Sequence, residues 1–244
     1  MRNPTRRNRN IGTSKQGHGQ NNELRIPYPA LVQKEFYERL ESYQKISKSI
    51  NGKDFDFVIE ETRKGSVHAC SIDDLVRIIE LIPEQDHEGL KLIILRQPKR
   101  KEETISPVWG RLIYSFEFEG ESEPAIILEA VDKTRKFKWS KKLTPDERKE
   151  LDLLKIDGHN IQEDQRSFQF DYEIENVRNT QLFRTLPHEF GHYVHYLEVV
   201  ERLGSEDEDF EQWESRHDSY FKIPNTQKEK FANSYVKKLS LKRF

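Results

Sequence analysis

The residues most able to do chemistry lie in one short segment, His188-Glu189-Phe190-Gly191-His192. Residues four apart in a helix lie about 40° apart around the axis and roughly 6 Å apart along it, so His188 and His192 would project from one face and bind one metal ion. Glu189 is turned by about 100° from His188, which would put it beside the metal, where it can take a proton from a water molecule. The spacing therefore predicts a zinc site with Glu189 as general base.

The same residues would also fit a surface helix that carries two solvated histidines. Against that interpretation, Phe190, Val194 and Leu197 give the helix an apolar side, so we expect it to pack. Gly191 costs a helix about 1 kcal/mol relative to alanine, which indicates that another backbone or a substrate must come close.

Catalytic zinc usually has three protein ligands, and two histidines leave it one short. Glu229, on a helix expected from Gln227 to Val236, is our candidate for the third. Thr226 and Glu229 also have the spacing of a capping box, in which the glutamate would serve the backbone of Thr226. Both roles for Glu229 stay open at this point.

Other histidines are weaker candidates for metal binding. His195 shares a face with His192 but lies roughly 10.5 Å along the axis from His188, so we expect it beside the metal or on the substrate side. His217 is flanked by aromatic residues that suggest packing. His68, His87 and His159 have no ligand spacing.

Strands followed by helices are expected to position this site. One helix is expected to begin after the N-cap Ser71 and to end at Pro83, and a second to begin at Thr144. The last part of the chain is expected to be helical, with an acidic link from Glu206 to Glu214. An amphipathic helix is expected from Leu31 to Ile50. This order favours an α+β domain over a doubly wound α/β sheet. The strands expected from alternation and apolar runs are 54–60, 91–97, 110–118, 125–130 and 168–174.

The whole chain of 244 residues has the length of one domain. We interpret residues 1–22 as a disordered basic tail and 23–244 as the single domain. The net charge of −2 predicts no nucleic-acid partner for the chain as a whole, although the tail leaves nucleic-acid association as an alternative. The single cysteine, Cys70, and the lack of a recognisable signal sequence lead us to expect a cytoplasmic protein. No run of ~20 apolar residues is present, so we expect no membrane partner.

The metal motif, followed by Glu229-Lys-Phe-Ala232, resembles the gluzincin branch of the zincin metallopeptidases, and most of all its small cytosolic bacterial members. The resemblance covers residues 185–236 and implies a site of two histidines and one glutamate from a downstream helix. Thermolysin-like members place an aspartate four residues after that glutamate. Here the place holds Asn233, whose carbonyl oxygen is expected to accept a hydrogen bond from the ring of His188.

The resemblance also implies a zincin-like fold: a small mixed sheet (strand, helix, three strands), then the metal-binding helix and the ligand helix. An edge strand would bind an extended peptide by strand addition, and residues 125–130 are the candidate. The implied reaction is hydrolysis of a peptide or protein substrate with Glu189 as base. Tyr220, Tyr235 and His217 are candidates for the donor to the oxyanion.

Two features leave alternatives open. Residues 131–180 match nothing in the family, and we interpret them as an insertion that shapes or covers the cleft. A catalytically silent zincin-fold module for binding or regulation would keep the same metal ligands. The intact Glu189 argues against it, because a purely structural site has no use for a base.

Overall fold

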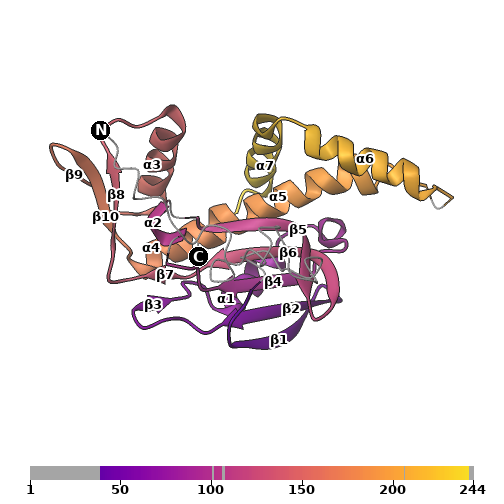
Figure 1. Cartoon of the computed structure of the whole chain (residues 1–244), viewed down its shortest axis with the longest axis horizontal. Helices are drawn as coiled ribbons and strands as arrows, with labels where there is room; N and C mark the ends of the chain where they lie inside the picture. Colours follow the sequence, from indigo (N-terminus) through magenta and orange to yellow (C-terminus); the bar gives the residue numbers. More distant parts are fainter. Residues whose placement is uncertain (1–38, 101, 106–107, 206, 242–244) are drawn as a thin grey trace, which may run out of the picture. The chain divides into compact units, whose positions relative to one another are not determined.

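A five-stranded mixed sheet lies beneath the metal motif in the computed structural model, which describes residues 39–100, 102–105, 108–205 and 207–241 (Figure 1). The tail 1–22 lies outside the described residues, and Leu40–Phe244 forms one compact unit. The three inner strands run parallel, and the two edge strands are antiparallel to their neighbours. In sheet order the strands are β1 (Tyr43–Ile50), β2 (Lys53–Glu60), β4 (Leu92–Arg96), β6 (Glu121–Glu129) and β5 (Gly110–Phe118).

The inner strands are those that the sequence predicts most directly. Every residue of β4 is buried, as expected of a continuous apolar run covered on both faces. The expected strands at 54–60, 91–97 and 110–118 are confirmed, and the one at 125–130 is the second half of β6. The expectation that 125–130 forms an edge is wrong, because β6 pairs with β4 on one side and with β5 on the other. The edge strand on this side is β5.

The amino-terminal edge strand corrects a second expectation. Residues 43–50 form β1, not the end of a helix, and residues 31–38 lie outside the described part. A tight turn joins β1 to β2 through Asn51 and Gly52, with φ of 51° and 79°. Asn-Gly is the pair that favours such a two-residue hairpin, because both residues tolerate positive φ.

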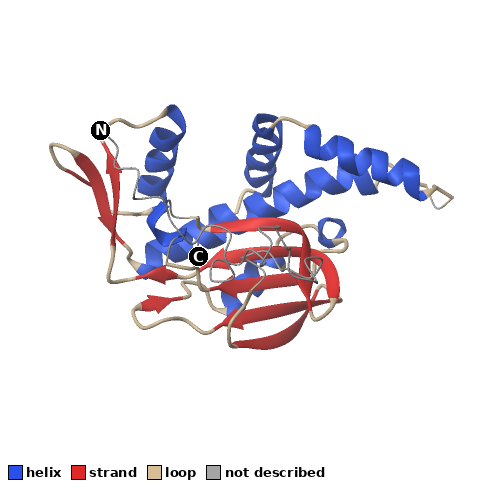
Figure 2. Cartoon of the chain, viewed as in Figure 1, coloured by secondary structure: helices blue, strands red, loops and turns tan. Residues whose placement is uncertain are grey.

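The helices cover the sheet and carry the metal motif (Figure 2). Helix α1 (Ile72–Ile79) begins after Ser71, which forms the expected capping box with Asp74. α1 and α5 share a buried cluster with the sheet that includes Phe55, Ile78 and Phe190. The chain stays helical through α4 (Ile174–Thr180), the wide turn η5 (Gln181–Thr185), α5 (Leu186–Tyr196) and the wide turn η6 (Leu197–Glu201). Two further helices follow: α6 (Phe210–Lys222), which begins inside the expected acidic link, and α7 (Asn225–Leu239).

Residues 131–180 build a smaller substructure beside the sheet. Helix α3 (Pro145–Asp157) starts with a capping box at Thr144 and packs with a three-stranded sheet around a second buried cluster that includes Leu154 and Phe170. That sheet has the order β8 (Lys136–Ser140), β10 (Ser167–Asp171) and β9 (Gln162–Glu163). The pair β3 (Ser66–Val67) and β7 (Val131–Asp132) joins this substructure to the main sheet.

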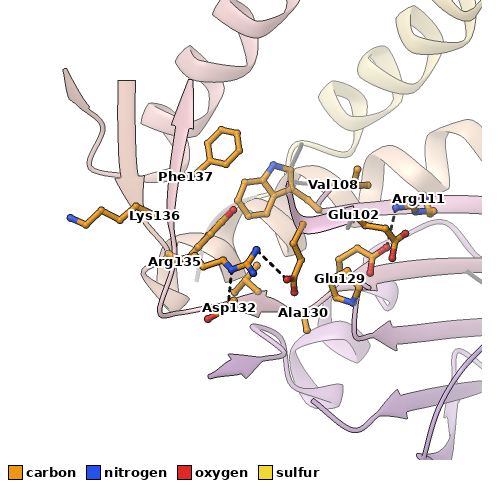
Figure 3. A pocket seen from close by; sticks show the side chains of 14 residues that line it. Glu102, Val108, Arg111, Glu129, Ala130, Asp132, Arg135, Lys136 and Phe137 are labelled. Atoms are coloured by element: carbon orange, nitrogen blue, oxygen red, sulfur yellow. Dashed lines mark hydrogen bonds and ion pairs between the residues drawn. The ribbon is translucent and has the colours of Figure 1, made fainter. Parts of the chain in front are cut away.

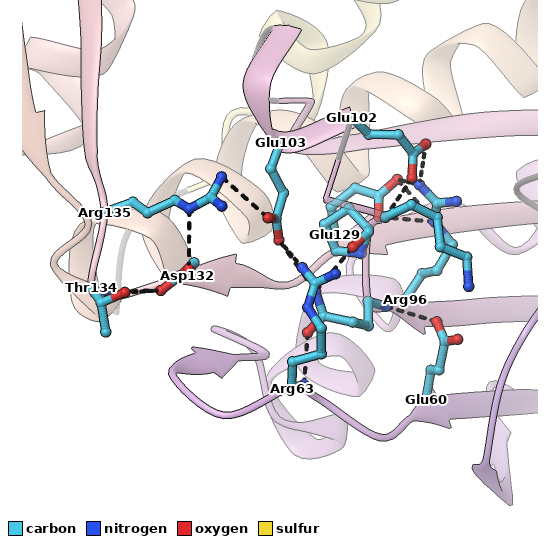
Figure 4. A network of polar contacts seen from close by, with 12 residues as sticks. Glu60, Arg63, Arg96, Glu102, Glu103, Glu129, Asp132, Thr134 and Arg135 are labelled. Carbon is cyan, nitrogen blue, oxygen red and sulfur yellow. Dashed lines mark hydrogen bonds and ion pairs between the residues drawn. The ribbon is translucent and has the colours of Figure 1, made fainter.

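Charged residues end the three parallel strands and meet in a buried network (Figure 4). Arg96, which ends β4 and is 1% exposed, donates from Nε to both carboxylate oxygens of Glu129 at 3.2 and 3.0 Å. Glu60, which ends β2, accepts from the backbone N–H of Gln97 at 2.8 Å. Arg96 also donates to Glu102 of α2 (Glu102–Ile105) at 2.9 Å, so the network holds the chain that leads into β5.

Candidate metal centre

Three potential ligand atoms converge above the sheet. Nε2 of His188 and Nε2 of His192 lie 3.1 Å apart on α5. The carboxylate of Glu229, which comes from α7, places one oxygen 3.3 Å from each of these nitrogens. The structure therefore brings together the three residues expected to bind the metal.

The spacing of these atoms fits zinc. Two atoms that bind one tetrahedral zinc ion at ~2.0–2.1 Å lie roughly 3.3 Å from each other. The observed separations of 3.1, 3.3 and 3.3 Å match that value without any rearrangement. Two imidazoles and a carboxylate are also the donor set of a common class of catalytic zinc site.

Glu229 is free of the capping role that the sequence left open. Helix α7 begins at Asn225 after Pro224, and no side chain caps it. Thr226 and Glu229 both lie within the helix. Hydrogen bonds from His188 and His192 hold the pKa of Glu229 well below its usual range, so the carboxylate stays charged. Its side chain is 55% exposed, which leaves it open towards solvent.

Gly191 allows α7 to come close enough to supply this ligand. A Cβ atom at Gly191 would lie 2.8 Å from Cα of Ala232 and 3.2 Å from Cβ of Tyr235. The close backbone expected from Gly191 is thus that of the ligand helix. Any larger residue would push α7, and Glu229 with it, away from the histidines.

Glu189 points towards the edge strand β5. Its Oε2 accepts a 2.8 Å hydrogen bond from the backbone N–H of Leu112. Burial raises the pKa of Glu189, whereas His188, His192 and the N–H of Leu112 act to lower it. A carboxylate with a raised pKa beside a metal site is well suited to accept a proton and release it again.

An open cleft of about 970 Å³ contains this group. His188, Glu189 and Glu229 line it, together with Gly110 at the start of β5. Residues of α3 and β8 form one wall and residues of α7 form the other; both helices stand on the same side of α5 in Figure 1. The segment 131–180, interpreted from the sequence as an insertion that shapes or covers the cleft, supplies one of its walls.

Arg184 ties that wall to the metal helix. It lies in the turn η5 just before α5 and donates two hydrogen bonds to Glu150 of α3, at 2.8 and 3.0 Å. Its Nε donates to Asp157 at 2.7 Å. The indole N–H of Trp109 donates to the same Glu150 at 3.1 Å. The sequence held no signal for these contacts, because they join residues far apart in the chain.

A smaller pocket of about 90 Å³ is lined by Trp109 and by residues at the ends of β6 and β7 (Figure 3). Charged residues line it, and they pair with each other: Arg111 with Glu129 at 3.1 Å and Arg135 with Asp132 at 3.3 Å. Since these charges neutralise one another, we assign no ligand to this pocket.

The two candidate tyrosines do not serve the cleft, which corrects the expectation that they donate to the oxyanion. Tyr220 is 0% exposed, and its hydroxyl donates to the backbone carbonyl of His192 at 3.2 Å and lies 2.8 Å from the hydroxyl of Tyr114. Tyr235 donates to the buried carboxylate of Asp86 at 2.8 Å. Both hydroxyls therefore have hydrogen-bond partners inside the protein.

The remaining candidate residues lie near the three ligand residues, but within the described part of the chain they form none of the expected side-chain hydrogen bonds with them. Asn233 lines the cleft, but its amide donates to the carbonyl of Glu229 at 2.6 Å, and the expected hydrogen bond with His188 is not formed in the described structure. His195 stacks on Phe231 with ring centroids 4.5 Å apart. His217 stacks on Trp213 at 4.9 Å, in line with the packing suggested by its neighbours.

Comparison with protein-family models, with curated proteins and with solved structures finds no match to this chain. Among the described residues, no helix is both long and apolar enough to cross a membrane. The site geometry is therefore the basis for assigning a function.

Proposed function

We propose that this chain is a zinc-dependent metallopeptidase in which His188, His192 and Glu229 bind the metal and Glu189 is the general base. The observation that carries the proposal is the tetrahedral spacing of the three ligand atoms next to a carboxylate with a raised pKa. Bound zinc would polarise the scissile carbonyl and acidify the attacking water.

Glu189 takes the proton of that water and later delivers it to the leaving amine. The backbone N–H of Leu112 holds the carboxylate in place on the side of the edge strand. A helix with both histidines above a mixed sheet, whose nearest edge strand is antiparallel, supports a zincin-like arrangement.

Strand β5 takes the place that the sequence assigned to residues 125–130 as the peptide-binding edge. Backbone groups alternate in direction along a strand, so Gly110 and Leu112 present theirs on the side away from β6, where the N–H of Leu112 is already bound to Glu189. Gly110 lines the cleft. An extended substrate added to this edge would pass over the metal ligands.

A cytoplasmic location belongs to the same proposal. Its support is Cys70, a buried and unpaired thiol that suits a reducing compartment.

The test compares wild type with Glu189→Gln for zinc content by atomic absorption and for hydrolysis of unfolded casein. We expect equal zinc content and a loss of activity of about 100-fold or more, because the amide cannot accept the proton. Glu198→Gln, an exposed change in the following turn, is the matched control.

Each alternative result has a definite meaning. Equal activity in wild type and Glu189→Gln overturns the role of the base. Stoichiometric zinc in a wild-type protein that hydrolyses nothing replaces the peptidase by a catalytically silent binding module.

A further inference from the structure

The two walls of the cleft differ in chemistry. On the side of β5, α3 and β8, the wall carries the apolar side chains Trp109, Trp139 and Leu153. The wall formed by α7 has polar and basic residues and no apolar side chain: Asn225, Thr226, Lys230, Asn233, Ser234 and Lys237. A substrate in this cleft therefore meets an apolar surface on one side and a basic one on the other.

The charges in the cleft divide into paired and free groups. Glu150 and Arg184 neutralise each other, and Glu229 belongs to the metal ligands. Within the described part of the chain, Lys149, Lys230 and Lys237 have no carboxylate within ion-pair distance, and all three are exposed.

Among the described residues that line the cleft, one acid lies outside the proposed metal site, the base Glu189 and the Glu150–Arg184 pair. Asp146, at the start of α3, is exposed and unpaired among the described residues. Among the described residues, four basic and four acidic side chains line the cleft, so its charges balance overall. Lys230 and Lys237 nevertheless lie free on the α7 wall, where the one acid is the proposed metal ligand Glu229.

We propose, on the basis of the proposed peptidase function, that the cleft selects extended peptide segments in which an acidic residue lies next to an apolar one. Successive side chains of an extended peptide point to opposite sides. A segment that lies between the two walls would thus turn its acidic side chain towards Lys230 and Lys237 of α7. Its apolar neighbour would face Trp109, Trp139 and Leu153.

Partly exposed ion pairs of this kind are individually weak and act together through long-range attraction. We therefore expect selectivity of roughly 3- to 10-fold in kcat/KM for each change of charge in the substrate.

The experiment uses three sets of peptides that differ at one position. The residues around a central peptide bond are apolar, and the position next to one of them is Glu, Gln or Lys. Cleavage by the zinc-loaded full chain is followed by mass spectrometry. We expect the order Glu, then Gln, then Lys, with a preference for Glu that weakens as salt rises because screening reduces the attraction.

The double variant Lys230→Glu, Lys237→Glu tests whether α7 is the source of the preference. We expect its preference to invert to Lys over Glu, with unchanged zinc content. The single variant Lys237→Glu, two turns of helix away from Glu229, should show an intermediate preference. Lys238→Glu is the matched control, since Lys238 is exposed on the same helix but does not line the cleft.

Failure of this inference is separable from failure of the proposed function. Cleavage of all three sets at equal rates, or an unchanged preference in the double variant, overturns the charge selection and leaves the peptidase standing. Absence of cleavage in every set, by a protein with full zinc content, overturns both.

Discussion

The hydroxyl of Tyr235 donates a 2.8 Å hydrogen bond to the buried carboxylate of Asp86, and this bond fastens α7 to the segment that precedes β4. Asp86 lies in the turn η4 (Glu84–His87) and is also paired with Arg202 at 3.1 Å. The Cβ atom of Tyr235 lies over Gly191. Tyr235 thereby connects η4, α5 and α7, the helix that carries Glu229.

Tyr235→Phe should weaken both the fold and the metal site. Removal of one partner of a buried carboxylate costs about 1–3 kcal/mol in the free energy of unfolding, measurable by urea denaturation. Zinc affinity, measured by competition with a chelator, should fall because α7 is held less firmly. If this effect acts through Glu229, it disappears in a Glu229→Gln background. A fall of equal size in both backgrounds would show that Tyr235 does not position the ligand.

Gly191→Ala should destabilise the protein although alanine is the better helix former. In an open helix the change would stabilise by about 1 kcal/mol. Here the added Cβ would lie 2.8 Å from Cα of Ala232, and overpacking of this kind costs about 1–3 kcal/mol. We expect a lower Tm and lower zinc affinity, with Glu214→Ala on an exposed face of α6 as control. A stabilised variant would show that the two helices can separate at no cost.

Zinc should stabilise the folded chain against heat. A ligand that binds only the native state at 100 times its Kd adds about 2.7 kcal/mol. Excess zinc should therefore raise Tm by several degrees, and a chelator should reverse the rise. His188→Ala should remove most of this response. A rise in Tm of equal size in that variant would place the bound zinc elsewhere.

Acid should destabilise the cleft wall through His159. This side chain is 3% exposed, and its Nε2 lies 3.0 Å from the hydroxyl of Thr180. Burial lowers the pKa of His159 to about 4, whereas in the unfolded chain it is ~6.5. The unfolded state therefore binds the proton first, and the stability is complete above pH ~6.5 and is lost as the pH falls towards 4.

The measurement for His159 is urea unfolding at several pH values between 7 and 4. The wild type should lose up to ~1.4 kcal/mol per pH unit from this group, and His159→Gln should show a slope smaller by that amount. Burial also lowers the pKa of His68 and His87, so some slope should remain in the variant. Equal slopes in the two proteins would show that His159 is not kept neutral by the fold.

The parts of the structure that local pattern decides were predictable from the sequence. Alternation along 110–118 predicts β5, and the capping residues Ser71 and Thr144 predict where α1 and α3 begin. The spacing of His188 and His192 on one helix follows from helix geometry alone. For Glu229, early in a predicted helix, two roles were open, ligand or cap, and the structure brings it to the two histidines.

The parts that depend on distant contacts were not predictable in this way. β1 is mostly exposed and polar, so its sequence has no apolar alternation, and the Asn51-Gly52 turn is the one local feature that favours a hairpin there. Sheet order is set by pairing between strands far apart in the chain, which is why residues 125–130 were wrongly placed at the edge. The direction of the Tyr220 hydroxyl likewise depends on its neighbours Tyr114 and His192.

Helix α7 carries the proposed metal ligand Glu229, the surface against Gly191 and the basic wall of the cleft, and it follows α5 by nearly thirty residues in the sequence. A backbone cut anywhere between His192 and Glu229 would place the histidines on one fragment and the carboxylate on the other. Zinc retention would then depend on the concentrations of the two fragments, one long and one short, so bound zinc would report their reassembly.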